Sequence, residues 1–319
     1  MRSKYRQQPL EFTGLKTVPI RERGGKVRVE HFARPYARGS GIASFIDSLP
    51  HLLASDSFRA VVDAIAGARA DKRAIVWGIG GHVVKCGLAP VLLDLMRRGY
   101  VTAFAMNGAA AIHDFEIAIA GQTSEDVEAV LPDGRFGSAE ETGREMNEAV
   151  RECAGETGFG EALGRRLARI ADPQFASCSL LHEAYAAGVP VTVHVAIGTD
   201  TPHTHPAAEG AAIGEASHRD FRLLCSIAKE LDAGGAYINV GSAVVLPEVF
   251  LKVVSVVRNL GHPLANFTTV NLDFLQHYRP KVNVVERPHA LAGGRGYSIT
   301  GHHELMVPLL AAALIERDA

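Results

Sequence analysis

Residues able to carry chemistry gather after two apolar runs in the stretch from residue 74 to 121. The first group, after the run over 74–77, consists of Gly78, Gly80, Gly81 and His82. The second group, after the run over 101–106, consists of Asn107, Gly108, His113, Asp114 and Glu116. Glycines let backbone N–H groups approach a phosphate, and His titrates near neutral pH. The pattern predicts a dinucleotide at the first turn with acid–base groups beside it, although the glycines could also serve only a tight turn from strand to helix.

Similar groups end the later apolar runs. They comprise Thr199, Asp200, His203 and His205, then Gly241, Ser242 and Glu248, and finally Asp273. In a parallel sheet all strands end at one edge, so we expect these groups to converge there with Gly78–His82 and Asn107–Glu116. Carboxylates can pair with ammonium groups, and we predict general bases among His113, His203 and His303.

A metal is the alternative use of one segment. His203 and His205 are two residues apart and Asp200 is close by, which together could hold a divalent ion. His in a proline-flanked loop can equally hydrogen-bond the backbone. Ser242 could present a hydroxyl or satisfy its turn, and Cys86, expected at a helix N-terminus, could be an activated thiol or a packing residue.

Apolar and helical patterns alternate over the chain. Strand-like runs at 74–77, 101–106, 189–197, 235–240 and 264–273 are separated by helix-like segments, and 302–316 closes the chain as a helix. This alternation predicts an α/β fold, Rossmann-like, with a mainly parallel sheet and helices on both faces. Residues 1–40 predict an N-terminal arm, since residues 1–30 hold eight Lys/Arg against three Glu, and 41–319 predict a single domain.

Composition excludes several classes of function. The net charge is −2, so no basic field favours nucleic acid. No run approaches the ~20 apolar residues of a membrane span. The N-terminal segment has no apolar stretch typical of a signal peptide, and four scattered cysteines form neither a zinc motif nor a disulfide framework. We therefore expect a cytoplasmic protein with no membrane or nucleic-acid partner, and a homo-oligomer because charged residues are only 21%.

The order of these segments resembles the deoxyhypusine synthase family. The residues that carry the resemblance are WGIGGHVVKCG, AMNGAAAIHDFE, GTDTPHTHP, INVGSAVVLPEVF, Tyr278-Arg279-Pro280 and the run Met306–Ala312, within residues 70–315. The resemblance implies an NAD-binding enzyme, a tetramer and a polyamine-like substrate. It implies cofactor contacts from Gly78, Gly80, Gly81, His82, Asn107, Gly108, Thr199, Asp200, Gly241 and Ser242.

The family's imine-forming lysine stands in a Trp-Gly-Lys motif, which this sequence lacks. Lys281 is displaced from that place, and Pro247-Glu248 replaces the family's catalytic His. We therefore predict NAD-dependent amine oxidation or transfer and not deoxyhypusine synthesis. The predicted catalytic residues are His113, Asp114, His203, Glu248 and Lys281, and the predicted substrate contacts are Glu116, His205, Asp273, Arg279 and His303. A metal-dependent hydrolase or lyase, and a non-catalytic nucleotide-binding protein, are the alternatives.

Overall fold

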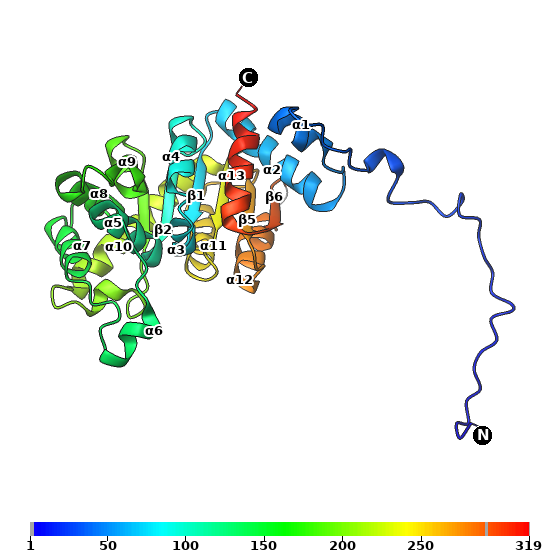
Figure 1. The fold of residues 1–319 in the computed structure, drawn as a ribbon, viewed down its shortest axis with the longest axis horizontal. Coiled ribbons are helices and arrows are strands. Elements are labelled where there is room, and N and C mark those ends of the chain that lie inside the picture. Colours follow the sequence, from blue (N-terminus) through cyan, green and yellow to red (C-terminus); the bar gives the residue numbers. More distant parts are fainter. Residues whose placement is uncertain (1–2, 291–292, 319) are drawn as a thin grey trace.

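A parallel sheet forms the centre of the molecule. The computed structural model describes residues 3–290 and 293–318, and within them six strands pair in the order β3-β2-β1-β4-β5-β6, every neighbouring pair parallel (Figure 1). The strands are β1 (Ile75–Ile79), β2 (Ala103–Asn107), β3 (Val191–His194), β4 (Ala236–Val240), β5 (Thr268–Asp273) and β6 (Arg295–Thr300). This confirms the predicted Rossmann-like α/β fold. The strand order reverses between β1 and β4, and ligands of open parallel sheets bind at that switch point.

Helices fill the connections between the strands. The longer ones are α1 (Gly41–Ser48), α2 (Leu53–Ala70), α4 (Ala89–Arg97), α5 (Gly108–Ala120), α7 (Glu140–Glu152), α8 (Phe159–Ile170), α10 (Gly210–Ala228), α11 (Val245–Asn259) and α13 (His303–Ile315). The shorter ones are α3 (Gly81–Lys85), α6 (Val127–Val130), α9 (Leu180–Ala186) and α12 (Tyr278–Pro280). Two 3-10 helices, η3 (Ala176–Cys178) and η4 (Thr201–Thr204), lie near β3 in sequence. The segment η6 (Lys281–Glu286) is a π-helix. In Figure 1 the chain after each strand, including α3 and α12, lies at the lower edge, which is the carboxyl edge of the sheet.

The core lies on both faces of the sheet. All five residues of β1 and of β4 are buried, as parallel strands covered by helices require. Ile75, Trp77 and Ile79 belong to one core cluster with side chains of α2 and α13, whereas Val76 and Tyr237 belong to a second cluster with α11. Alternate residues of a strand point to opposite faces, so this split follows from the strand period of two.

Three elements differ from those predicted from the sequence. The strand β6 was not predicted, because its run of Gly, Arg and Ser is polar and only Ile299 within it is buried. The helix-like segment between the first two strands consists of two helices, α3 and α4, which are separated at Gly87 with φ +72°. The helix α10 begins at Gly210, whereas the clearest helical spacing of apolar residues, at Phe221, Leu224 and Ile227, predicts a start near Asp220. The sheet edge and the helix start both lack the apolar periodicity on which the prediction depended.

The N-terminal segment extends away from the body. The described residues from 3 to 40 are exposed apart from a half-buried His31, and they run outward before α1 begins (Figure 1). Several large apolar side chains of this arm are more than two thirds exposed, namely Tyr5, Leu10, Phe12, Leu15, Ile20 and Val29. Within the described ranges, no helix combines the length and apolar character needed to cross a membrane.

Candidate functional site

The turns that follow β1 and β4 touch at the switch point. The backbone N–H of Gly80 donates to the carbonyl of Val240 at 2.9 Å. A Cβ on Gly80 would overlap the carbonyl oxygen of Gly241, whose own φ is +67°. Gly80 is therefore required by the close approach of the two backbones, and Gly241 by its left-handed backbone conformation. Gly78, in contrast, lies inside β1 and not in the predicted turn, and its missing side chain makes room for the Tyr237 hydroxyl.

The turn after β1 also contacts the helix that follows β2. A Cβ on Gly81 would lie 3.1 Å from the Cβ of Ala109 and 3.2 Å from Cδ2 of His113. The helix α3 that begins at Gly81 has five residues, so its macrodipole is small, and an anion here would depend mainly on the backbone N–H groups of the turn. The contact brings His113 directly to the predicted dinucleotide turn.

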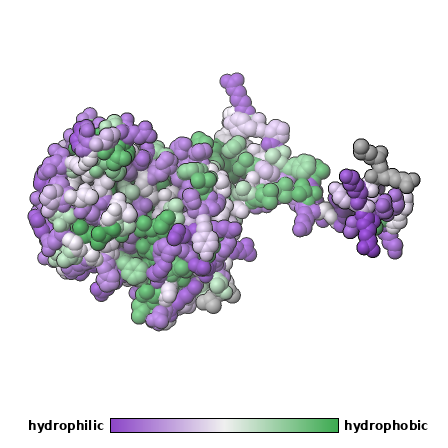
Figure 2. Space-filling model, turned by 90° about the horizontal axis from the view of Figure 1, so that it is seen from below, coloured by the Kyte–Doolittle hydropathy of each residue, from purple (hydrophilic) through white to green (hydrophobic). Residues whose placement is uncertain are grey.

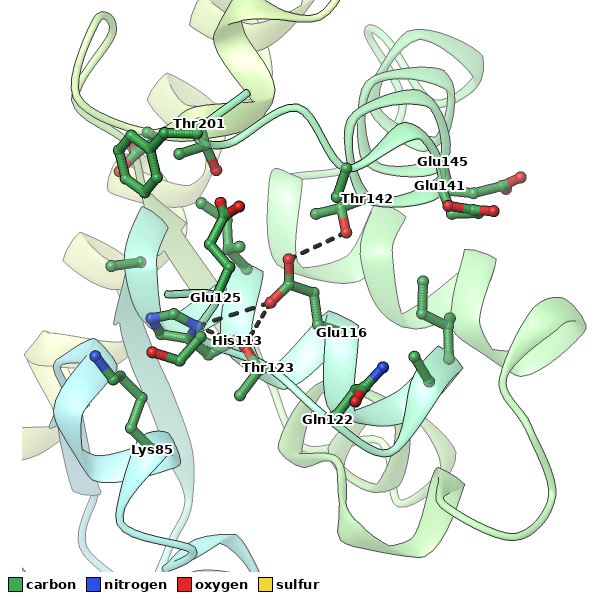
Figure 3. Close-up of a pocket in the computed structure, with 18 of the residues that line it drawn as sticks. Lys85, His113, Glu116, Gln122, Thr123, Glu125, Glu141, Thr142, Glu145 and Thr201 are labelled. Carbon is green, nitrogen blue, oxygen red and sulfur yellow. Dashed lines mark hydrogen bonds and ion pairs between the residues drawn. The ribbon is translucent and has the colours of Figure 1, made fainter. Parts of the chain in front are cut away.

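A large cavity opens beside this contact at the carboxyl edge. Its volume is about 1000 Å³, at the upper end of the range for small-molecule sites. The charged residues that line it are Lys85, Glu116, Glu125, Glu141, Glu145 and Asp200, together with the titratable His113. Figure 3 shows Lys85, His113, Glu116 and Glu125 arranged around its centre. Five carboxylates face one lysine, and only Glu145 among the five is ion-paired with arginines, Arg144 and Arg166. The cavity therefore favours a cation.

His113 and Glu116 form one hydrogen-bonded network in this cavity. They lie three residues apart on α5, so they share a helix face. The hydroxyl of Thr123 lies 2.7 Å from His113 Nδ1 and donates to Glu116, and Thr142 donates to the other Glu116 oxygen at 3.1 Å (Figure 3). Burial alone would raise the pKa of Glu116, but the hydrogen bonds from His113, Thr123 and Thr142 together hold that pKa below its usual value. Glu116 is thus a fixed negative charge, and His113 keeps Nε2 for another partner.

Asp200 lies against the N-terminus of α5. A Cβ on Gly108 would overlap the Asp200 carboxylate, which accepts the Ala196 N–H at 2.9 Å. Asn107 caps the same helix end by accepting the Ala110 N–H at 2.9 Å. Burial raises the pKa of Asp200, while its hydrogen bonds act in the opposite direction. The helix end predicted to contact a cofactor is therefore occupied by two side chains of the protein. Thr199, whose hydroxyl donates to Ala196 O, lines the cavity beside Asp200.

Asp114 has a structural role and does not reach the cavity. It is fully buried, and it accepts hydrogen bonds from the Ser179 hydroxyl at 2.6 Å and from the backbone N–H groups of Leu180 and Leu181 at 2.8 Å each. Burial raises the pKa of Asp114 to about 6. One position along a helix turns a side chain by about 100°, so Asp114 points at α9 while His113 and Glu116 point at the cavity. The predicted catalytic role of Asp114 is corrected accordingly.

The alternative metal site is also corrected. His205 accepts the Ala207 N–H at Nδ1, and its Nε2 lies 3.2 Å from Glu140, so its ring is engaged with α7. His203 lines a void of about 10 Å³ with Asp200 and Gly108. The ligand atoms of Asp200, His203 and His205 do not all lie within 4.8 Å of one another. Within the described part of the chain, the ligand atoms of His82, Cys86 and Glu304 do.

The candidates after β4 lie apart from the cavity. Glu248 is partly exposed on α11, where it pairs with Arg279 at 3.3 Å and accepts from Asn283 at 2.9 Å. Lys281 is exposed and lies 4.0 Å from Glu286. None of them lines the cavity. Ser242 is buried, and its hydroxyl accepts the Leu246 N–H at 3.2 Å, so it serves the start of α11 and does not present a nucleophile.

A second polar group lies beyond β5. His303, the first residue of α13, is 1% exposed, and its Nε2 lies 3.5 Å from Asp273. A Cβ on Gly241 would lie 3.0 Å from Cε1 of the His303 ring. The same ring packs against the ring of His82, and the two ring centroids are 5.4 Å apart. The structure therefore brings His82, Gly241, Asp273 and His303 together on the β4–β5 side of the switch point.

Much of the cavity wall consists of residues that the sequence pattern did not indicate. Lys85, Gln122, Thr123, Glu125, Glu141 and Thr142 line it but were not predicted as site residues. All of them except Lys85 lie between 122 and 142, a polar stretch whose richness in Glu was the available signal. Cys86 is the C-cap of α3 and not at a helix N-terminus, and burial followed by the nearby Glu304 raises the pKa of its thiol. The expected position of Cys86 at a helix N-terminus is therefore wrong, and the alternative of an activated thiol loses its basis.

Comparisons with known proteins extend the fold assignment. No family model and no curated protein matches the sequence. The fold is similar to a conserved putative LOR/SDH protein from Methanococcus maripaludis S2, with 14% identity, TM-score 0.53, 84% of this chain and 71% of that chain covered. It is similar to a putative deoxyhypusine synthase from Entamoeba histolytica, with 11% identity, TM-score 0.51, and 89% and 96% covered.

A third similar structure is the ternary complex of AgrE with ornithine and NAD+. The identity is 16% and the TM-score 0.50, over 84% of this chain and 34% of that chain. The chain therefore spans about a third of the length of AgrE. At these identities the three likenesses establish a shared fold, and they agree with the distant relationship to deoxyhypusine synthase expected from the sequence.

Proposed function

We propose that the protein is an NAD-dependent enzyme that oxidises or transfers a small cationic amine. The observation that carries this proposal is the acidic cavity at the carboxyl edge, in which His113 contacts the glycine turn and Glu116 is held ionised. An ammonium group would enter a cavity lined by Glu116, Glu125, Glu141 and Asp200, with Glu116 at its centre. A neutral or anionic substrate would leave these carboxylates without a counter-charge.

NAD is proposed at the switch point. Gly80 and Gly81 are packed where the turns after β1 and β4 meet, and the strand order reverses there, which is where dinucleotides bind on folds of this order. The solved complex of AgrE with ornithine and NAD+, which shares the fold, supports the pairing of this cofactor with a cationic amine. NAD would supply a hydride acceptor beside the cavity.

The chain's own residues would then bind and deprotonate the amine. Glu116, fixed by Thr123 and Thr142, would hold the ammonium group. His113, engaged through Nδ1, would take the proton from the reacting nitrogen at Nε2. Lys281 lies outside the cavity lining, so an imine with the substrate is not part of this proposal.

Calorimetry and absorbance test the proposal together. NAD is titrated into the purified protein, and NADH formation is then followed with ornithine, spermidine and a neutral alcohol analogue of each. We expect NAD binding, and turnover only with the cationic compounds. Failure to bind NAD would overturn the proposal, as would equal use of neutral analogues. Tight NAD binding without turnover of any amine would favour a non-catalytic nucleotide-binding protein.

A further inference from the structure

A second group of potential ligands lies on α3 outside the lining of the acidic cavity. His82 and Cys86 are four residues apart, so they project from the same side of this short helix. Glu304, the second residue of α13, lies across from them, with its Oε2 3.7 Å from Cys86 Sγ. One ligand atom from each of the three residues lies within 4.8 Å of the other two.

We propose that His82, Cys86 and Glu304 bind a divalent transition-metal ion, with Zn²⁺ as the expected occupant. Imidazole, thiolate and carboxylate are the three donor types that protein zinc sites use. With metal–ligand bonds of about 2.0–2.3 Å, tetrahedral geometry separates ligand atoms by roughly 3.4–3.7 Å. Because the ligand atoms already lie within 4.8 Å of one another, a closure of at most roughly 1–1.4 Å is required, and rotation of the surface side chains can supply it.

The donor set selects among cations. Mg²⁺ and Ca²⁺ prefer oxygen ligands, and only Glu304 offers one here. A thiolate with an imidazole favours borderline and soft ions such as Zn²⁺ and Co²⁺. The three side chains leave a tetrahedral ion one position for water or another ligand. His82 and Glu304 are exposed and Cys86 is half-buried, so the ion can enter from solvent.

Neighbouring side chains support this assignment. His302 Nδ1 lies 3.9 Å from the other Glu304 oxygen, and the His302 ring stacks on Phe274 with centroids 5.7 Å apart. Phe274 also lies 6.0 Å from the His82 ring. These aromatic contacts restrict the rings on one side of the site, and supporting contacts of this kind orient metal ligands.

The site would tie two parts of the chain that are far apart in sequence. Its ligands come from α3, which follows β1, and from α13, which follows β6. Lys85, on the same helix as His82, lines the acidic cavity. An ion here would hold α3 at one position relative to α13 and thereby fix the Gly80–Gly81 turn. This role does not depend on the proposed amine or on NAD.

Metal binding to the full-length chain tests the inference. The protein is treated with a chelator, dialysed, and titrated with Zn²⁺ and separately with Mg²⁺ by calorimetry. We expect one Zn²⁺ per chain and no Mg²⁺ binding. Cys86→Ala should weaken Zn²⁺ binding at least about 100-fold, because even loss of a supporting partner costs 10–100-fold. Cys178→Ala, which removes a half-buried cysteine from η3, is the matched control and should bind as the wild type does.

Co²⁺ provides a readout that separates coordination from folding. Wild type and Cys178→Ala should develop the thiolate-to-cobalt charge-transfer absorption, and Cys86→Ala should lose it while its circular dichroism stays unchanged. Glu304→Gln should keep the absorption with weaker affinity. Unchanged Zn²⁺ affinity in Cys86→Ala, or no thiolate band in the wild type, would overturn the site. NAD binding is measured in parallel, so either proposal can fail while the other stands.

Discussion

Gly80 and Gly241 meet backbone to backbone, and no side chain fits at Gly80 without displacing the carbonyl of Gly241. This contact joins the two halves of the sheet at the point where the strand order reverses. We expect Gly80→Ala to lower the free energy of unfolding by at least about 3 kcal/mol, since neither backbone can move independently of its strand. Urea unfolding measures the loss.

The control for this prediction is Gly67→Ala, because that glycine lies in α2 with open space around it. Alanine there should be neutral or stabilise by about 0.5–1 kcal/mol. If both variants unfold at the same urea concentration as the wild type, the contact at the switch point is looser than described.

Glu116 should determine affinity for the cationic ligand. Glu116→Gln keeps the side-chain shape but removes the charge held by Thr123 and Thr142. We expect the dissociation constant for the amine to rise about tenfold or more, because a hydrogen bond to a charged group contributes about 1.5–3 kcal/mol. Glu230→Gln, an exposed change before β4 at the opposite edge of the sheet, should leave it unaltered. Equal affinities in all three proteins would remove Glu116 from the binding site.

Asp220 should make stability depend on pH. This buried carboxylate accepts the N–H groups of Gly160 at 2.9 Å and Val193 at 2.7 Å, and burial raises its pKa to about 7 from an ordinary 3.8. The folded state therefore holds the proton more tightly than the unfolded state. Its contribution to stability is complete below pH 3.8 and is lost as the pH rises to about 7, with a slope near 1.4 kcal/mol per pH unit.

The variant Asp220→Asn isolates this contribution. Burial lowers the pKa of His194 from 6.5 to about 4. The contribution of His194 to stability is therefore lost as the pH falls below 6.5, which is opposite in sign to the contribution of Asp220. The wild-type profile alone is therefore a sum. The difference between wild type and Asp220→Asn, measured by urea unfolding from pH 4 to 7, should fall with rising pH. A stability difference that does not change with pH would contradict the raised pKa of Asp220. The control is Asp71→Asn, a change at an exposed position.

The arm predicts association between chains. Leu10, Phe12, Leu15 and Ile20 are each more than two thirds exposed on a segment that also carries the basic residues. Apolar groups gathered on one exposed segment are typical of a contact with another molecule. We propose that a second copy covers them, as the expected homo-oligomer requires. Sedimentation should give a mass above the 34.1 kDa of one chain.

Deleting residues 1–28 should reduce that mass, and replacing the four apolar residues by Ser should do the same while leaving the arm's charge intact. A charge-only contact would be disrupted by the deletion but not by the serines. A monomeric wild type would show that the arm has no such partner.

The parts of the fold that the sequence predicted are those with a clear apolar period. β1, β2, β4 and β5 are continuous buried runs, and α11 and α13 carry repeated apolar residues, so the parallel sheet and its carboxyl edge followed directly. The edge strand β6 could not be recognised, because an edge strand needs few buried side chains.

The candidate site was only partly predictable for a different reason. The polar residues after β2 indicate His113 and Glu116, but they give Asp114 the same role, because a polar cluster read without the helical period does not separate the faces of a helix. Applying the helical period to α5 would have separated it. The cavity wall from Gln122 to Thr142 could not be placed, since the position of a long connection depends on contacts that no local pattern encodes.

The connection from β2 to β3 has a consequence for how this fold could change over time. Apart from Lys85 and the residues Thr199, Asp200 and Thr201, every residue that lines the acidic cavity comes from this one connection, between 109 and 170. The glycine contact at the switch point belongs to β1 and β4 and contains none of it. An exchange of that single continuous segment would therefore give the molecule a new ligand preference while the other half of the sheet stayed intact, which makes the region a natural unit for recombination and for engineered chimaeras.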